Sequence, residues 1–109
     1  MINSFDFYFD FISPYSFLAH KEIKIIERRE SIKIRYKPIL LGGLHNLHGI
    51  KAPAFIPAKA KHMVRDCKLI AEKKKIKFKF NSYFPIKSLN LMRGVIVAEE
   101  DNYKSYYID

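Results

Sequence analysis

The chain has 109 residues, one cysteine and a formal net charge of +9, from 20 lysine and arginine residues against 11 acidic residues. This length allows a single domain with a modest core, and a hydrophobic fraction of 49% argues against intrinsic disorder. A lone cysteine excludes an internal disulfide and is typical of a reducing compartment.

The positive charge is spread along the chain and is densest between residues 73 and 79, where we expect a solvated face. Neither zinc-finger spacing nor the aromatic–basic signature of an RNA-binding sheet accompanies it, so no nucleic-acid partner is expected. Asp6 and Asp10 interrupt the N-terminal apolar run, which excludes a secretory signal. No apolar stretch is long enough to span a bilayer. These features predict a cytoplasmic protein with no membrane partner.

Residues 5–11 alternate between aromatic and polar side chains, which is the pattern of a strand with one dry face. The aromatic face carries Phe5, Phe7, Phe9 and Phe11, and the opposite face carries Asp6, Tyr8 and Asp10. A helix is expected to begin next, because Ser13 is a preferred N-cap and Pro14 suits the first helical position. The Ser13 hydroxyl would then lie beside unpaired amides at the positive end of a helix dipole, which favours an anion.

A βαβ unit is predicted over residues 1–38. Residues 15–30 have helical apolar spacing, with Leu18, Ile25 and Ile26 on one face. Residues 32–38 alternate again and end at a proline that cannot continue pairing. A helix between two strands is too long for a hairpin turn, so the strands should be parallel with a right-handed crossover.

Residues 39–56 show no sustained period, so a long ordered loop is expected, with one helical turn near residues 44–47. His45 and His48 lie there, but two histidines lack the further ligands that a metal site requires, and we interpret them as solvent-facing. No metal is expected.

Helices are predicted over residues 57–75 and 87–106, with an extended stretch at residues 76–80 between them. The buried stripes are expected to comprise Met63, Val64, Cys67, Ile70 and Ala71 in the first helix, and Leu89, Met92, Val95, Ile96 and Tyr103 in the second. Cys67 is therefore a buried small hydrophobe rather than a nucleophile. Gly94 would allow another helix to approach closely. The final residues suggest no finishing element.

A two-stranded parallel sheet is normally part of a larger sheet covered on both faces. Only helices follow the predicted βαβ unit in this sequence. Partner chains, or further strands of a longer protein, are therefore expected to complete the sheet.

Several stretches, in order along almost the whole chain, resemble the 2-hydroxychromene-2-carboxylate isomerases and kappa-class glutathione transferases of the DsbA-like thioredoxin superfamily. The stretches are residues 6–16, 35–44, 57–59, 65–66, 84–89, Arg93 and 98–100. The resemblance implies an α/β fold, an incomplete thioredoxin-like (DsbA-like) domain over residues 1–109. Its parts would be an N-terminal βαβ unit (1–38), a loop (39–56) and part of a helical insertion (57–109), without the closing strands and their cis-proline loop.

The resemblance also implies a glutathione-dependent isomerase or transferase. Ser13 is its catalytic residue, in the place of the reactive cysteine of dithiol oxidoreductases, and holds glutathione as a thiolate. Pro14, Tyr15 and the main chain of Ile50 are the other implied glutathione contacts. The partners are glutathione, a small aromatic or other electrophilic substrate, and a second copy in a homodimer. The family often has Asn or Gln where this chain has Ile50, and Asn where it has Lys87, so the substrate stays open.

Two alternatives remain beside that interpretation. On the local sequence alone, the favoured interpretation of Ser13 is a plain helix cap, worth about 1 kcal/mol. The chain would then be a non-catalytic fragment or binding module of the same fold. A thiol–disulfide oxidoreductase is disfavoured, because no Cys-x-x-Cys motif stands at the helix start. Arg65 and Asp66 are expected to pair with each other within the fold, without a role in chemistry.

Overall fold

A computed structural model describes residues 3–109 and begins with the βαβ unit that the sequence predicts. The unit comprises β1 (Ser4–Phe9), α1 (Pro14–Glu30) and β2 (Lys33–Pro38). The strands pair in parallel, from Ser4 opposite Lys33 to Phe9 opposite Pro38. β1 ends two residues earlier than Phe11, because the chain turns at Asp10, whose carbonyl accepts a hydrogen bond from the Ser13 amide at 3.0 Å.

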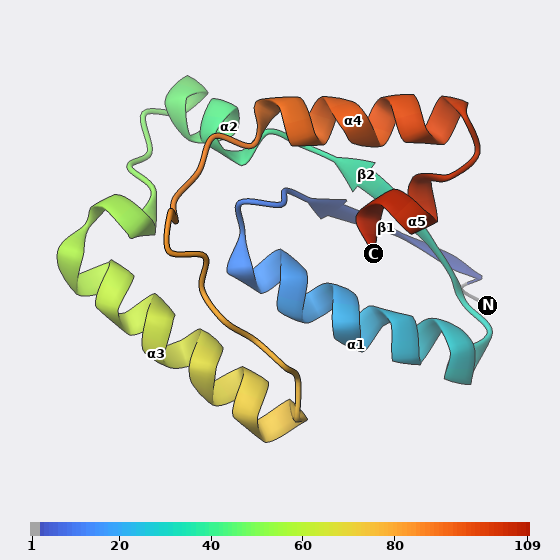
Figure 1. Cartoon of the computed structure of the whole chain (residues 1–109), viewed down its shortest axis with the longest axis horizontal. Coiled ribbons are helices and arrows are strands. Elements are labelled where there is room, and N and C mark those ends of the chain that lie inside the picture. The colour runs from blue at the N-terminus through green and yellow to red at the C-terminus, as the bar shows by residue number, and fades with distance from the viewer. Residues whose placement is uncertain (1–2) are drawn as a thin grey trace.

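The rest of the described chain is helical, with an irregular segment at residues 75–88 (Figure 1). The helices are α2 (Leu41–Leu47), the 3₁₀ turn η1 (Pro53–Phe55), α3 (Pro57–Lys74), α4 (Leu89–Glu100) and α5 (Lys104–Ile108). The predicted loop at residues 39–56 therefore contains more helix than a single turn. The single helix predicted over residues 87–106 is wrong. It is divided because Asn102 adopts a φ of 63°, a left-handed conformation that asparagine tolerates.

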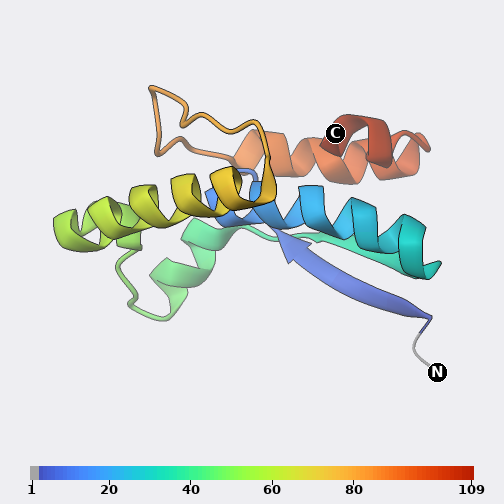
Figure 2. The same ribbon diagram turned by 90° about the horizontal axis from the view of Figure 1, so that it is seen from below.

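One face of the sheet is covered and the other is open. The dry face carries Phe7, Phe9 and Tyr36, whose ring centroids lie 5.6–5.9 Å apart. Met92 and Val95 of α4 pack on this face, together with side chains of α5, and α1 lies on the same side (Figure 2). Tyr8, on the opposite face, is 60% exposed. The alternating pattern in the sequence therefore predicted correctly that Phe7 and Phe9 face the core, whereas its assignment of Phe5 to the covered face is wrong, because Phe5 at the start of β1 is exposed.

A second cluster joins α1 to α3. It contains Leu18, Met63, Cys67 and Ala71, with Phe78, Phe80 and Phe84 packed against it. The predicted stripe of α3 is confirmed, whereas that of α1 is wrong beyond Leu18, because Ile25 and Ile26 are exposed and His20 is buried instead. Residues 76–80 pair with no strand of the described chain, since their aromatic rings turn into this cluster.

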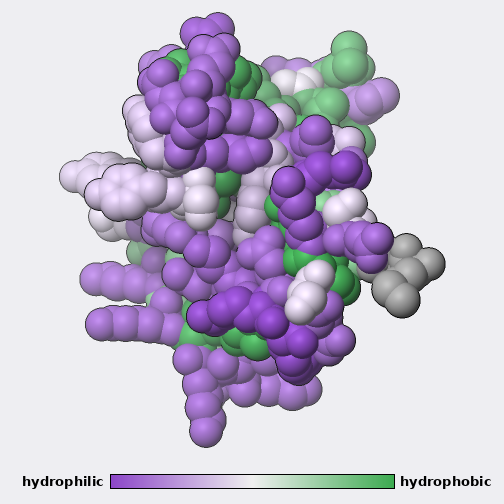
Figure 3. Space-filling view, turned by 90° about the vertical axis from the view of Figure 1, so that its right-hand side faces the viewer, coloured by the Kyte–Doolittle hydropathy of each residue, from purple (hydrophilic) through white to green (hydrophobic). Residues whose placement is uncertain are grey.

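The sequence did not reveal α5, a short helix that packs against α4. The Tyr107 hydroxyl donates to the Leu91 carbonyl at 2.9 Å and lies against Gly94, so the glycine does allow a close approach. In the predicted buried stripe of the last helix, Met92 and Val95 are buried, whereas Leu89, Ile96 and Tyr103 are exposed. The molecular face at the C-terminal ends of α1 and α4 is mainly hydrophilic (Figure 3). No helix within residues 3–109 combines the length and apolarity needed to cross a membrane.

Candidate functional site

Ser13 is the N-cap of α1, as its sequence context predicts. Its backbone is extended, with φ −83° and ψ 116°, and its Oγ accepts a hydrogen bond from the Ser16 amide at 3.2 Å. A hydroxyl that accepts this bond still has its own hydrogen to donate. Ser13 can therefore cap the helix and donate to an anion at the same time.

Asp10 fixes the turn that precedes Ser13. The residue is only 1% exposed. Its Oδ1 accepts from the Ile12 amide at 3.0 Å and its Oδ2 from the Leu41 amide at 2.8 Å. The strand pattern placed this side chain on the wet face, which is wrong, because the chain has left the strand and the carboxylate caps the first turn of α2. The sequence did offer one signal for this role: Asp10 is an acidic residue placed between the end of the aromatic strand and the Ser13-Pro14 pair.

Tyr15 joins the first turn of α1 to the middle of α3. Its hydroxyl donates to Asp66 Oδ2 at 2.7 Å. The expected pairing of Arg65 with Asp66 is wrong, because Arg65 is exposed and forms no ion pair with Asp66 among the described residues. Burial, helped by the bond to Asp66, raises the pKa of Tyr15 and keeps the phenol protonated. Burial also raises the pKa of the neighbouring Cys67 thiol, in agreement with a structural role for that residue.

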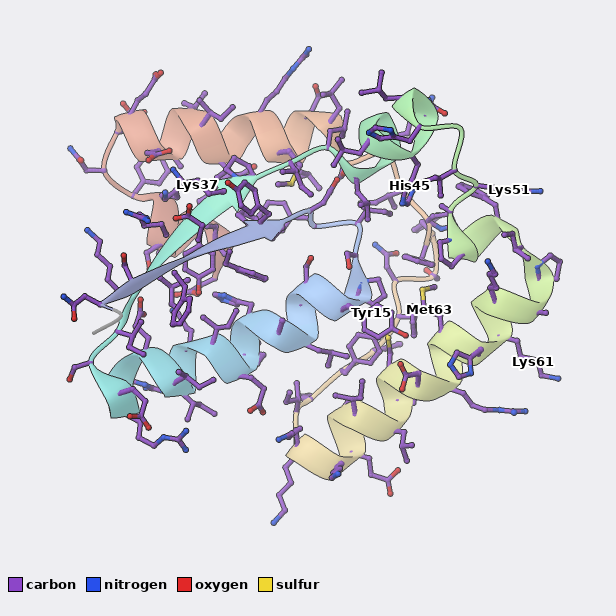
Figure 4. The ribbon with its side chains drawn as sticks, turned by 180° about the vertical axis from the view of Figure 1, so that it is seen from behind. Tyr15, Lys37, His45, Lys51, Lys61 and Met63 are labelled. Carbon is purple, nitrogen blue, oxygen red and sulfur yellow. The ribbon has the colours of Figure 1, made fainter. Side chains whose placement is uncertain are left out.

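A cavity of about 1080 Å³ opens in front of Ser13. Its walls come from the first turns of α1, α3 and α4, from most of α2 with the following loop, and from residues 84–86. Tyr15, His45 and Met63 lie on the inner sides of their helices around this space, whereas Lys61 projects from the outer side of α3 (Figure 4). All four sequence-predicted binding residues, Ser13, Pro14, Tyr15 and Ile50, line the cavity.

Ile50 offers less of its main chain than the sequence suggested. Its amide already donates to the His45 carbonyl at 2.8 Å, which leaves its carbonyl for a ligand. His45 itself was interpreted as a solvent-facing loop residue, which is wrong: it belongs to α2, is half-buried and lines the cavity. Ser88 is a second lining residue that sequence reasoning missed. The only local signal for a binding role of Ser88 was its position next to Lys87 and directly before an apolar helix.

The cavity is electropositive. The N-terminal turns of α1, α3 and α4 face it (Figure 1), and such turns present unpaired amides and the positive ends of helix dipoles. Lys51, Lys59 and Lys87 line it as well, and no aspartate or glutamate does. The arrangement suits an anion next to an apolar body. Within residues 3–109, no group of three or more potential metal ligands comes together.

Comparison with known proteins identifies the family. A family model of the DsbA-like thioredoxin domain matches residues 4–107. The chain belongs to the DsbA-like thioredoxin family. The βαβ unit with Ser13 at the start of α1 thus belongs to a DsbA-like domain, and the fold class that the sequence indicated is confirmed.

Curated relatives of this DsbA-like chain are similar over part of their length. Glutathione S-transferase kappa 1 of Caenorhabditis elegans is 40% identical over 68 residues, covering 62% of this chain and 30% of the relative. 2-Hydroxychromene-2-carboxylate isomerase of Sphingobium xenophagum is 33% identical over 92 residues, covering 83% and 47%. The human kappa 1 enzyme is 28% identical over 93 residues, covering 85% and 40%. The chain therefore spans less than half the length of these relatives. No solved structure matches it significantly.

Proposed function

We propose that this chain forms the thiolate side of a glutathione-dependent isomerase or transferase site, with Ser13 as the catalytic residue. The observation that carries the proposal is the Ser13 Oγ at the cavity wall, which accepts from the Ser16 amide and keeps its hydrogen for a ligand. A helix N-terminus and a hydroxyl donor both favour a thiolate over a thiol, because each interacts more strongly with the negative sulfur.

The named relatives support glutathione as the thiol. Two of them are kappa glutathione transferases and one is a 2-hydroxychromene-2-carboxylate isomerase. In the isomerase reaction proposed here, the thiolate adds to the electrophilic carbon of the substrate. The ring then opens, a bond rotates, and the thiolate leaves again. Glutathione is regenerated and the substrate undergoes no net oxidation or reduction. Pro14, Tyr15 and the Ile50 carbonyl would form the adjoining wall.

The experiment measures the pKa of bound glutathione, from the ultraviolet absorbance of its thiolate as a function of pH. We expect a lower thiol pKa on the protein than in water, and a return toward the free value in Ser13→Ala. Ser105→Ala, an exposed serine on α5, is the matched control and should behave as wild type. The wild-type protein showing neither calorimetric heat nor a thermal shift with millimolar glutathione would refute the proposal.

The second candidate function is binding without turnover, and one observation favours it. The chain spans 30–47% of the relatives' lengths, so residues that complete their sites need not be present here. One assay distinguishes the two candidate functions. Binding with a lowered glutathione pKa, but no isomerase or conjugation product, indicates a binding module.

A further inference from the structure

The side chain of Ser88 is buried without serving its own helix. The residue is 4% exposed and occupies the N-cap position of α4, and its carbonyl accepts from the Met92 amide at 2.9 Å. Its backbone has φ −97° and ψ 2°, and its side chain makes no capping hydrogen bond. Buried hydroxyl groups in proteins normally have a partner. The Ser88 hydroxyl makes no hydrogen bond to another described residue, and because Ser88 lines the cavity, this hydroxyl is available to a ligand group.

The surroundings of Ser88 select an anion as that partner. Unpaired amides of α4 lie beside it, Lys87 precedes it, and no carboxylate shares the cavity wall. Two acidic groups that contact lining residues are already engaged: Asp10 by the Ile12 and Leu41 amides, and Asp66 by the Tyr15 hydroxyl. A ligand anion at Ser88 therefore meets donors and positive charge, and no lining group of its own sign.

The rest of the wall selects the body of the ligand. Aliphatic side chains predominate among the lining hydrophobic residues, over three aromatic ones. They include Leu40, Leu41, Ile50, Ala54, Met63 and Ile86. Such a wall stabilises a flexible hydrocarbon chain, because each methylene that it removes from water contributes favourably to binding. The volume of about 1080 Å³ also leaves room for a thiol ligand at Ser13.

We propose that the start of α4 is a second anion subsite, in which Ser88 and Lys87 hold the carboxylate of an aliphatic carboxylic acid whose chain lies in the cavity. This subsite is formed by α4 and is separate from the Ser13 subsite of α1. It does not depend on glutathione, so its test stands even where the proposed function fails.

Decanoate is the probe, used below its micelle concentration and measured by calorimetry without glutathione. Decanol and decyltrimethylammonium carry the same chain with a neutral and a cationic head, and naphthoate carries the carboxylate on an aromatic body. We expect decanoate to bind at least about tenfold more tightly than decanol, since a hydrogen bond to a charged group is stronger than one to a neutral group. Decyltrimethylammonium should not bind. Equal affinity for decanoate and decanol overturns the subsite, and tighter binding of naphthoate overturns the aliphatic assignment.

Two variants test the residues. Ser88→Ala and Lys87→Gln should each weaken decanoate by about tenfold while leaving decanol unchanged, because only the charged head is affected. Ser82→Ala and Lys73→Gln, at exposed positions outside the cavity lining, are the matched controls. Thermal unfolding should show Ser88→Ala folded, since its side chain does not cap α4. Decanoate affinity equal to wild type in both variants would overturn the assignment, and Ser13→Ala should retain decanoate binding.

Discussion

Asp10 is the residue on which the geometry of the Ser13 turn depends. Its carboxylate accepts hydrogen bonds from the Ile12 amide at 3.0 Å and from the Leu41 amide of α2 at 2.8 Å, and the residue is almost fully buried. The end of β1 is thereby joined to α2. We expect Asp10→Asn to lose about 1.5–3 kcal/mol of unfolding free energy, because the asparagine NH₂ group would face one of the two amide donors. Urea denaturation measures this loss.

A suitable control is Asp6→Asn, which removes an exposed ion pair of Asp6 with Arg35. Exposed ion pairs contribute about 0.2–1 kcal/mol, so this variant should remain close to wild type. If the two variants lost equal stability, the amide contacts of Asp10 would not be the source of its effect. The Asp10 variant should also weaken glutathione binding, since the turn that carries Ser13 would loosen.

Contact between α4 and α5 depends on Gly94, which leaves space for the Tyr107 ring. A Cβ at this position would overlap the Tyr107 hydroxyl and lie 2.6 Å from its ring Cζ. Gly94→Ala should therefore destabilise the protein by about 1–3 kcal/mol through overpacking. This loss is expected even though alanine has a higher helix propensity than glycine, a difference that by itself would stabilise α4 by about 1 kcal/mol. Chemical denaturation and hydrogen exchange of α5 measure the effect.

Two comparisons make the Gly94 prediction specific. Gly42→Ala, in α2 with nothing within 4 Å of the new Cβ, should be neutral or stabilising. In a Tyr107→Ala background, Gly94→Ala should become stabilising as well, because the obstacle is gone. Stabilisation by Gly94→Ala in the otherwise wild-type protein would show that α5 is not held against α4.

Elements with a regular period were predictable from the sequence, and elements set by tertiary contacts were not. Alternation in β1 and β2 and the apolar stripe of α3 identified the βαβ unit and a buried Cys67. The start of α2 depends on the Asp10 carboxylate, from a residue 31 positions earlier. The division between α4 and α5 depends on the left-handed backbone of Asn102. Neither feature produces a periodic pattern in the sequence.

The candidate site divides in the same way. Ser13, Pro14 and Tyr15 are adjacent, and helix capping gives them a local signature that the sequence displays. Ser88 and His45 become site residues only when α2 and α4 are brought to the Ser13 turn, so their role is not visible along the chain. Electropositivity of the cavity likewise arises from three helix starts meeting in space.

At the scale of the whole molecule, His20 links α1, β2 and α5. Its Nδ1 lies 3.0 Å from the Tyr36 hydroxyl and its Nε2 lies 2.9 Å from Asp109 Oδ1. Lys24 also pairs with Asp109. Burial raises the pKa of Tyr36 to about 12, so its hydroxyl remains a donor. The neutral imidazole satisfies both partners, accepting at Nδ1 and donating from Nε2.

Burial lowers the pKa of His20 below its ordinary value of 6.5, against an opposing effect of the Asp109 carboxylate. Between the lowered folded pKa and about 6.5, the unfolded chain therefore binds more protons than the folded chain. Stability should rise with pH through this window and be lost as pH falls below about 6.5. Urea midpoints measured on both sides of this pH test the prediction. His20→Gln should flatten the dependence, whereas His48→Gln, at an exposed position, should preserve it. A wild-type midpoint that rose on acidification would mean that the charged imidazole is the form that holds α5 in place.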